Sequence, residues 1–330
     1  MLNAFLPGTP GAVGFAPTDS PEPLDRAVWI DVADPLAWEK PMVEERFGLS
    51  LPTRAGMTEI EASSRTFRSR GAVFLTIPLV VGLASDDPRT VPVTFILMRE
   101  RLITMRYGDP QPFRILTSAY EHQPPPADPM LVLLRLLELV VDRAADTLEH
   151  MGSEIDAIAR RIFGAPADRR LSTGDLNLIL RRIGLTQFVL TKEHDSLVAL
   201  ARAIAFLGVP VPEAEGETAA RPDRAHRDAL KVLQRDIASL NENSAFLFSN
   251  VAFLLDAAMG RISVEQSAII KIFSVAAVVL LPPTMVASIY GMNFEHMPEL
   301  SWTWGYPLAL LLMVLSAVLP YVWFKRKGWL

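Results

Sequence analysis

Two stretches near the C-terminus decide the fold: IFSVAAVVLLPPTMVASIYGMNF, residues 272–294, and WTWGYPLALLLMVLSAVLPYVWF, residues 302–324. Each is a run of 23 residues without a charged side chain or a histidine. At about 1.5 Å per residue, a helix of that length reaches roughly 34 Å, enough to cross a hydrocarbon core of about 30 Å. The sequence therefore predicts two transmembrane helices and excludes a purely soluble protein.

The rest of the 330-residue chain is acidic. The sequence holds 32 Lys and Arg against 37 Asp and Glu, and residues from 261 onward hold only five of the former and three of the latter, so the first 260 carry a net charge of −7. A nucleic-acid-binding protein needs a basic face, which this body lacks. The absence of cysteine excludes disulfides, thiolate metal sites and a cysteine nucleophile. No basic residue precedes Arg26, so we expect no signal peptide.

Residues 1–125 are predicted to form an α/β domain whose strand order the sequence does not reveal. Short β-prone runs are separated by turn signals; they lie at 27–32, 72–81, 91–98 and 102–106. Residues 35–47 and 58–66 have helical patterns between the first two runs.

Long helices follow this domain. Residues 126–218 are predicted to form a helical hairpin, in which Asp128 and Pro129 begin a helix that ends near Phe163 and a second helix covers 173–207. Residues 219–271 form a stalk helix, and because no proline occurs from 225 to 281, the simplest interpretation is one helix from 225 to 290 that continues into the first span. Two helices that meet near Gly260 are the alternative.

A heptad pattern marks the stalk. Leucines recur every seven residues, at 233, 240, 247 and 254, and residues 230, 237, 244, 251 and 258 occupy the interleaved positions. This pattern is typical of a helix that packs against partner helices.

Flanking charges predict the orientation of the two spans. The basic tail 325–330 contains Lys325, Arg326 and Lys327, whereas the link 295–301 contains two acids and no Lys or Arg. By the positive-inside rule, both termini are cytoplasmic and the link is external. The tryptophans at 302, 304, 323 and 329 and Tyr321 are expected to anchor the membrane interfaces.

One face of the first span is small and hydroxylated. Residues spaced by three and four share that face: Ser267, Ile270, Ser274, Ala277, Leu281, Thr284, Ser288 and Gly291. Val275, Val279, Val286 and Tyr290 lie away from it. Close helix packing and a pore lining both favour such residues, so the face alone leaves both interpretations open.

Adjacent prolines at 282 and 283 favour the pore. They remove two backbone donors at membrane depth and leave carbonyls near residues 278 and 279 to be satisfied by protein or water. Two spans cannot enclose a lumen, so a pore requires several identical chains around an axis.

The sequence that follows this face contains motifs that resemble those of a known family. Tyr290-Gly291-Met292-Asn293 is followed by Phe294-Glu295-His296-Met297-Pro298-Glu299-Leu300, and the chain ends in Phe324-Lys325-Arg326-Lys327-Gly328-Trp329-Leu330. These motifs in these places resemble the CorA family of bacterial magnesium channels, closely over 265–330 and more loosely over the stalk and N-terminal domain, for example at 59–65.

The resemblance implies a homopentamer in the bacterial inner membrane. It implies an α/β cytoplasmic funnel, a stalk helix continuous with the pore-lining span 272–294, and an outer ring of second spans, 302–324. Asn293 of the Gly-Met-Asn triplet is then expected to form a ring at the outer mouth. There its amide oxygen would accept hydrogen bonds from the water shell that Mg²⁺ releases reluctantly. Gly291 would let backbone carbonyls approach the axis.

Further roles follow from the same resemblance. Thr284 matches a pore-lining threonine, Leu281 lies at a hydrophobic constriction, and Phe273 lies at a second constriction although the helical wheel favours Ser274 on the axis. Ser267 stands where family members often carry asparagine, which weakens an ion site there. Glu295 and Glu299 are expected to attract cations to the mouth or to be ordinary solvated loop charges.

The resemblance also implies that cytoplasmic Mg²⁺ closes the channel by bridging carboxylates of neighbouring funnels. No motif matches such a site residue by residue. Candidate ligands are Asp86, Asp87, Asp228 and Asp236, although a plain solvated face explains them as well.

Other classes are less consistent with the sequence. The five histidines lack the paired spacing of a zinc site, no Gly-rich phosphate loop follows a strand, and the spans hold no ionisable residue for a proton relay, so we expect neither an enzyme nor an organic cofactor. A membrane-anchored oligomeric sensor or scaffold leaves the double proline and Gly-Met-Asn unexplained. A zinc transporter of a related branch shares Gly-Met-Asn but typically lacks Met-Pro-Glu-Leu. The expected cargo is therefore Mg²⁺, with Co²⁺ and Ni²⁺ as secondary ions, driven by the membrane potential.

Overall fold

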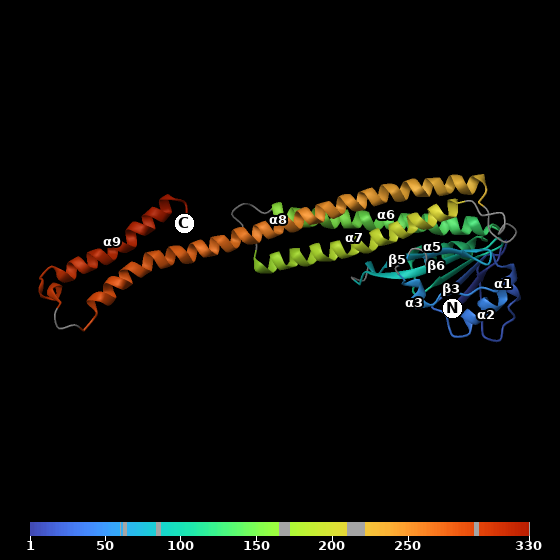
Figure 1. Cartoon of the computed structure of the whole chain (residues 1–330), viewed down its shortest axis with the longest axis horizontal. Coiled ribbons are helices and arrows are strands. Elements are labelled where there is room, and N and C mark those ends of the chain that lie inside the picture. Colours follow the sequence, from blue (N-terminus) through green and yellow to red (C-terminus); the bar gives the residue numbers. More distant parts are fainter. Residues whose placement is uncertain are drawn as a thin grey trace. The chain divides into compact units, whose positions relative to one another are not determined.

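The computed structural model describes residues 1–59, 61, 65–83, 87–164, 172–209, 222–293 and 297–329, without the side chains of 173, 299 and 300. The chain forms two compact units (Figure 1). One comprises Met1–Gly164 and Arg181–Leu254, and the other comprises Ala165–Leu180 and Leu255–Leu330.

The first unit contains a seven-stranded sheet in the order β2-β1-β3-β7-β6-β5-β4. The strands are β1 (Leu2–Phe5), β2 (Ala12–Gly14), β3 (Trp29–Ala33), β4 (Thr66–Ser69), β5 (Ala72–Val81), β6 (Arg89–Leu97) and β7 (Leu102–Arg106). Only β3 and β7 pair in parallel, with Asp31 opposite Thr104; the other neighbouring strands of this sheet are antiparallel. The four predicted β runs correspond to β3, β5, β6 and β7.

Helices cover both faces of the sheet, which makes three layers (Figure 1). On one face Ile30, Phe74 and Ile96 pack with Val43 of α2 (Glu39–Phe47) and Met57 of α3 (Arg54–Met57). The other face carries aromatic rings. There Trp29 stacks on Phe5 at 4.3 Å between centroids and meets Phe113 of α5 (Gln111–His122) at 6.3 Å. The short α1 (Glu22–Arg26) precedes β3.

The helix predicted at 58–66 is only partly confirmed: of the residues that the structure describes there, Arg65 is helical, whereas Thr58, Glu59 and Glu61 are not. The Thr53 hydroxyl accepts a hydrogen bond of 3.1 Å from the Gly56 amide, so the helix starts at Arg54 and ends at Met57. Thr66 belongs to β4, because it pairs with Leu75 of β5.

Three long helices follow the sheet: α6 (Pro129–Phe163), α7 (Thr173–Gly208) and α8 (Arg224–Tyr290). The predicted cap of α6 is confirmed, since the Asp128 carboxylate accepts a 2.8 Å bond from the Met130 amide. The helix α8 is unbroken through Gly260, as the simplest interpretation predicted.

The partner helices that the heptad pattern requires belong to the same chain. A Cβ atom at Gly152 of α6 would lie 3.8 Å from Cδ2 of Leu247, and the His194 ring of α7 meets Phe248 of α8 at 5.9 Å. The heptad residues of the first unit are buried apart from half-buried Leu240: Leu230, Leu233, Ile237, Ser244, Leu247, Val251 and Leu254. These heptad residues are therefore packed within the chain itself.

Candidate functional site

The last third of α8 and the helix α9 (Gly305–Arg326) are both long and apolar enough to cross a membrane. A short 3-10 turn, η3 (Pro298–Ser301), precedes α9. The membrane-spanning part of α8 and the whole of α9 belong to the same compact unit.

One face of α8 is covered within the unit. Val275 is 4% exposed, and the other covered positions follow it at steps of three and four. They are half-buried: Val279, Pro282, Pro283, Val286 and Tyr290. Because an α-helix repeats every 3.6 residues, these positions form one stripe.

The small, hydroxylated face lies opposite that stripe and is exposed along its full length. Its members are all exposed: Ser267, Ile270, Ser274, Ala277, Leu281, Thr284, Ser288 and Gly291. Phe273 is 72% exposed and lies about 60° from the middle of this face at about 100° per residue. We call this set, with Phe273, the open face of α8. Helix packing within the chain therefore does not explain the small residues.

The double proline lies within a continuous helix. Prolines at 282 and 283 carry no amide hydrogen for the carbonyls four residues earlier, those of Val278 and Val279. Thr284 adds a bond in the same turn, because its hydroxyl donates to the Leu280 carbonyl at 2.7 Å. With its hydrogen engaged, the Thr284 oxygen offers only lone pairs on the open face.

The Gly-Met-Asn triplet ends α8. The Gly291 amide donates to the Ala287 carbonyl at 2.9 Å and the Met292 amide to the Ile289 carbonyl at 3.3 Å. A Cβ atom at Gly291 would lie 3.0 Å from the Ala287 oxygen, so glycine permits this tight last turn. Asn293 is exposed just beyond it. Glu295 and the side chain of Glu299 lie outside the described residues.

The regulatory candidates that the structure describes do not form a cluster. Asp87 is exposed and lies 3.9 Å from Arg89, Asp228 pairs with Lys231 at 3.1 Å, and Asp236 is exposed on α8. Asp86 lies outside the described residues. Within the part of the chain that the structure describes, no three His, Asp or Glu side chains are placed to hold a metal ion.

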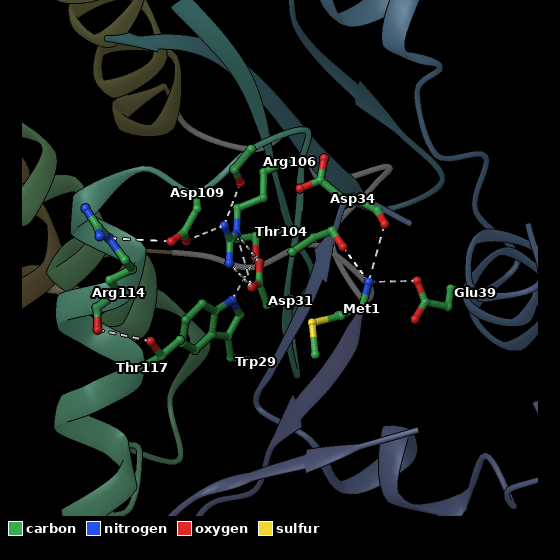
Figure 2. A network of polar contacts seen from close by, with 12 residues as sticks. Met1, Trp29, Asp31, Asp34, Glu39, Thr104, Arg106, Asp109, Arg114 and Thr117 are labelled. Atoms are coloured by element: carbon green, nitrogen blue, oxygen red, sulfur yellow. Dashed lines mark hydrogen bonds and ion pairs between the residues drawn. The ribbon is translucent and has the colours of Figure 1, made fainter. Parts of the chain in front are cut away.

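A buried polar network that the sequence analysis missed lies between β3, β7 and α5 (Figure 2). The Arg106 guanidinium pairs with the fully buried Asp31 at 3.0 Å and with Asp109 at 2.9 Å. Thr104 donates to Asp31 at 2.7 Å and accepts from the Trp29 indole at 2.9 Å. Burial alone would lower the pKa of Arg106, but the charge of Asp31 and the hydrogen bonds outweigh it and raise that pKa. An aspartate inside an apolar strand was the available signal.

Another buried acid lies in the helical layer. Burial raises the pKa of Glu193 on α7 to about 8, and the charge of Arg143 on α6 opposes part of that rise. At the start of α8, His226 lies 3.0 Å from Asp128 and 3.1 Å from Asp223, so it ties the first turns of α8 and α6 together.

Comparisons with known proteins agree with this architecture. The family model described as CorA-like Mg²⁺ transporter protein matches residues 25–326. The magnesium transport protein CorA of Pectobacterium atrosepticum is 36% identical over 317 residues, covering 94% of this chain and 95% of that protein. The protein of the same name from Escherichia coli K12 is 36% identical over 315 residues, 94% of each chain.

Solved structures share the fold. The complete structure of the CorA magnesium transporter from Methanocaldococcus jannaschii matches with a TM-score of 0.74 at 16% identity, over 100% of this chain and 99% of that one. The cytoplasmic domain of ZntB from Vibrio parahaemolyticus matches with a TM-score of 0.53 at 13% identity, over 79% of this chain and 97% of that one. The expected class, an α/β domain followed by a long helix and a C-terminal membrane helix, is confirmed.

Proposed function

The chain belongs to the CorA-like Mg²⁺ transporter family, and from that premise we propose that it forms a channel through which Mg²⁺ crosses the bacterial inner membrane. The open face of α8 is the observation that carries the proposal. It holds the hydroxyls of Ser274, Thr284 and Ser288 and ends beside Asn293, while the opposite stripe is covered within the chain. A helix used only as an anchor has no reason to keep a polar, uncovered face at membrane depth.

The assembly we propose is a homopentamer with the open faces around its axis. Two membrane helices cannot enclose a lumen, so copies of the chain must do so. The stalk supports association, because Val232, Phe246 and Phe253 are large apolar residues of α8 that stay exposed in the single chain. The number of copies, five, is taken from the resemblance to the CorA family.

Selection of the ion is proposed to take place without removing its water. The waters of a hydrated cation donate hydrogen bonds, so the pore needs acceptors; Asn293 supplies amide oxygens and Thr284 supplies lone pairs. Leu281 and Phe273 present apolar side chains that constrict the pore, with Ala277 between them. Tyr290, Gly291 and Met292 fix the turn that presents Asn293.

The membrane potential is the proposed driving force. For a divalent ion it is worth about 4.6 kcal/mol per 100 mV, or more than a thousandfold in concentration. We place both termini in the cytoplasm, because Lys325, Arg326 and Lys327 lie at the C-terminal end of α9. The external link then carries Glu295 and Glu299, whose charges attract cations to the mouth.

Gating by cytoplasmic Mg²⁺ is part of the same proposal. Asp87, Asp228 and Asp236 are exposed, and Asp86 adjoins the first of them, so bridging would have to join carboxylates of different chains. Co²⁺ and Ni²⁺ are proposed secondary ions. Zn²⁺ is the competing cargo, because the ZntB domain shares the fold of the N-terminal region.

Flux through reconstituted vesicles tests the proposal. Full-length protein in sealed vesicles, with an inside-negative potential imposed, should load Mg²⁺ and lose that uptake when the potential is collapsed. Parallel measurements with Co²⁺, Ni²⁺ and Zn²⁺ rank the cargo. Uptake of Zn²⁺ alone would assign the chain to the competing cargo, and no uptake of any ion would leave a non-conducting scaffold.

A further inference from the structure

Four basic side chains gather where α9 returns to α8. Lys325, Arg326 and Lys327 end α9, and Lys271 lies on α8 in the same compact unit. All four are exposed, and in the part of the chain that the structure describes none of them pairs with a carboxylate.

Aromatic rings hold two of these cations. The Lys327 ammonium lies 4.9 Å from the centroid of Trp323, and the Lys271 ammonium lies 5.9 Å from that of Trp329. The two tryptophans are joined through buried Phe324, at 5.0 Å from Trp323 and 5.3 Å from Trp329. Cation–π contacts at such distances are attractive and orient the ammonium groups.

The end of α9 is shaped to make this cluster. Gly328 has φ +68°, a left-handed conformation that glycine adopts without strain. The amides of Lys327, Gly328 and Trp329 donate to the last carbonyls of the helix, at 3.1, 3.2 and 3.1 Å. This glycine cap turns Trp329 back onto Phe324 and toward Lys271.

We propose that Lys271, Lys325, Arg326 and Lys327, with the rings of Trp323 and Trp329, bind the headgroup of an anionic phospholipid. Four clustered cations repel a metal ion and attract a phosphate. Lys325, Arg326 and Lys327 lie at the end of an apolar helix that is long enough to span the bilayer, and Lys271 directly precedes the apolar run of α8. This is the level at which tryptophan and lysine meet headgroups. Clustered basic residues at that level are the sequence mark of anionic-lipid recognition.

The site joins two helices. Lys271 belongs to α8 and the other three cations belong to α9, so one headgroup contacts both and should stabilise their association. This inference rests on the membrane placement proposed above, but not on Mg²⁺ as the cargo. Its test therefore uses readouts that contain no ion flux.

Lipid-dependent unfolding of the full-length protein in mild detergent tests the site. Added phosphatidylglycerol should raise Tm further as its concentration increases, because a ligand of the folded state stabilises that state, and phosphatidylcholine should not. Glycerol 3-phosphate at the same concentration should leave Tm unchanged, since it lacks the acyl chains that hold the headgroup at the surface. Equal shifts with both lipids, or with glycerol 3-phosphate, would overturn the proposal.

Variants of the basic residues test whether the phosphatidylglycerol-dependent rise in Tm originates at this site. The double variant Lys271→Gln/Lys327→Gln should lose at least half of the phosphatidylglycerol shift, while the charge-matched control Lys192→Gln/Arg235→Gln, whose sites lie in the first unit, should keep it. A full shift in the first double variant contradicts the site. Should that variant not assemble, the wild type decides: brominated phosphatidylglycerol must quench tryptophan fluorescence more than brominated phosphatidylcholine at equal mole fraction, and equal quenching rejects the proposal.

Discussion

The hydroxyl of Thr284 donates to the carbonyl of Leu280 at 2.7 Å, in the turn where Pro282 and Pro283 remove two backbone donors. This bond fixes the side chain and commits its only hydrogen. The oxygen on the open face can then accept but not donate. The waters around a hydrated cation donate hydrogen bonds, so the Thr284 oxygen can accept one from them.

Thr284→Val should therefore lower Mg²⁺ uptake about three- to tenfold, since one lost hydrogen bond is worth about 0.5–1.5 kcal/mol. Valine keeps the shape of threonine and removes the acceptor. Thr284→Ser keeps the hydroxyl and should retain most of the uptake. Initial rates in vesicles measure both variants, and a valine variant as fast as the serine variant would show that Thr284 does not contact the hydrated ion.

Glu193→Gln should change the pH dependence of stability. The folded pKa of about 8 lies above the ordinary value of 4.5, so the folded state binds the extra proton and stability falls as pH rises through that window. Between the two pKa values, the free energy of unfolding falls by about 1.4 kcal/mol per pH unit, and this loss is complete above about pH 8.

Thermal unfolding of the full-length protein at pH 5 and pH 8 measures this effect. The glutamine variant should have a Tm only slightly above that of the wild type at pH 5 and a Tm well above it at pH 8. Glu154→Gln on α6 is the control, because that carboxylate is partly exposed and lies 3.9 Å from Arg182. A gain at Glu193 that is equal at both pH values contradicts the prediction.

Asp31→Asn should destabilise the α/β domain by about 3–5 kcal/mol, because it leaves the Arg106 guanidinium buried without its main partner. Asp109→Asn is the matched control. Asp109 pairs with the same guanidinium but its side chain is 55% exposed, so its loss should cost much less. Calorimetry of the two variants compares them, and equal losses would show that burial of Asp31 does not set the energy.

Periodicity explains which parts of the fold were predictable. The two-sided character of α8, with Ser274 exposed and Val275 covered, follows from steps of three and four residues. The cap at Asp128 follows from local chemistry. The strands β1, β2 and β4 have only three or four residues each and little pattern of their own; pairing with longer neighbours defines them.

Contacts between distant segments explain what was missed. Asp31 and Arg106 lie 75 residues apart and meet only because β3 and β7 are parallel neighbours, which no local pattern specifies. The heptad pattern correctly indicated packing, but a pattern on one helix does not say whether its partners belong to the same chain. The pore roles of Asn293, Leu281 and Phe273 stay predictions, since they depend on other copies of the chain.

Cytoplasmic Mg²⁺ at millimolar concentration should slow proteolysis of the full-length protein if carboxylates of neighbouring chains bind it. Asp228→Asn/Asp236→Asn should reduce that protection several-fold, while Asp146→Asn/Asp156→Asn on α6 should keep it. Gel analysis of timed digests, with Mg²⁺ or with chelator, gives the ratio of the two cleavage rates for each variant. Identical cleavage of the wild type with and without Mg²⁺ would remove the regulatory role.

Asn293→Ala should lower Mg²⁺ uptake more than tenfold and leave the oligomer intact. The side chain is exposed beyond the last turn of α8, so the loss should come from the missing amide oxygen. Asn177→Ala, at an exposed position on α7, controls for losing an asparagine. Size-exclusion chromatography checks assembly and vesicle flux checks transport. An assembled Asn293→Ala variant with normal uptake would remove Asn293 from the conduction path, because a ring at the mouth of the pore must meet every ion that passes.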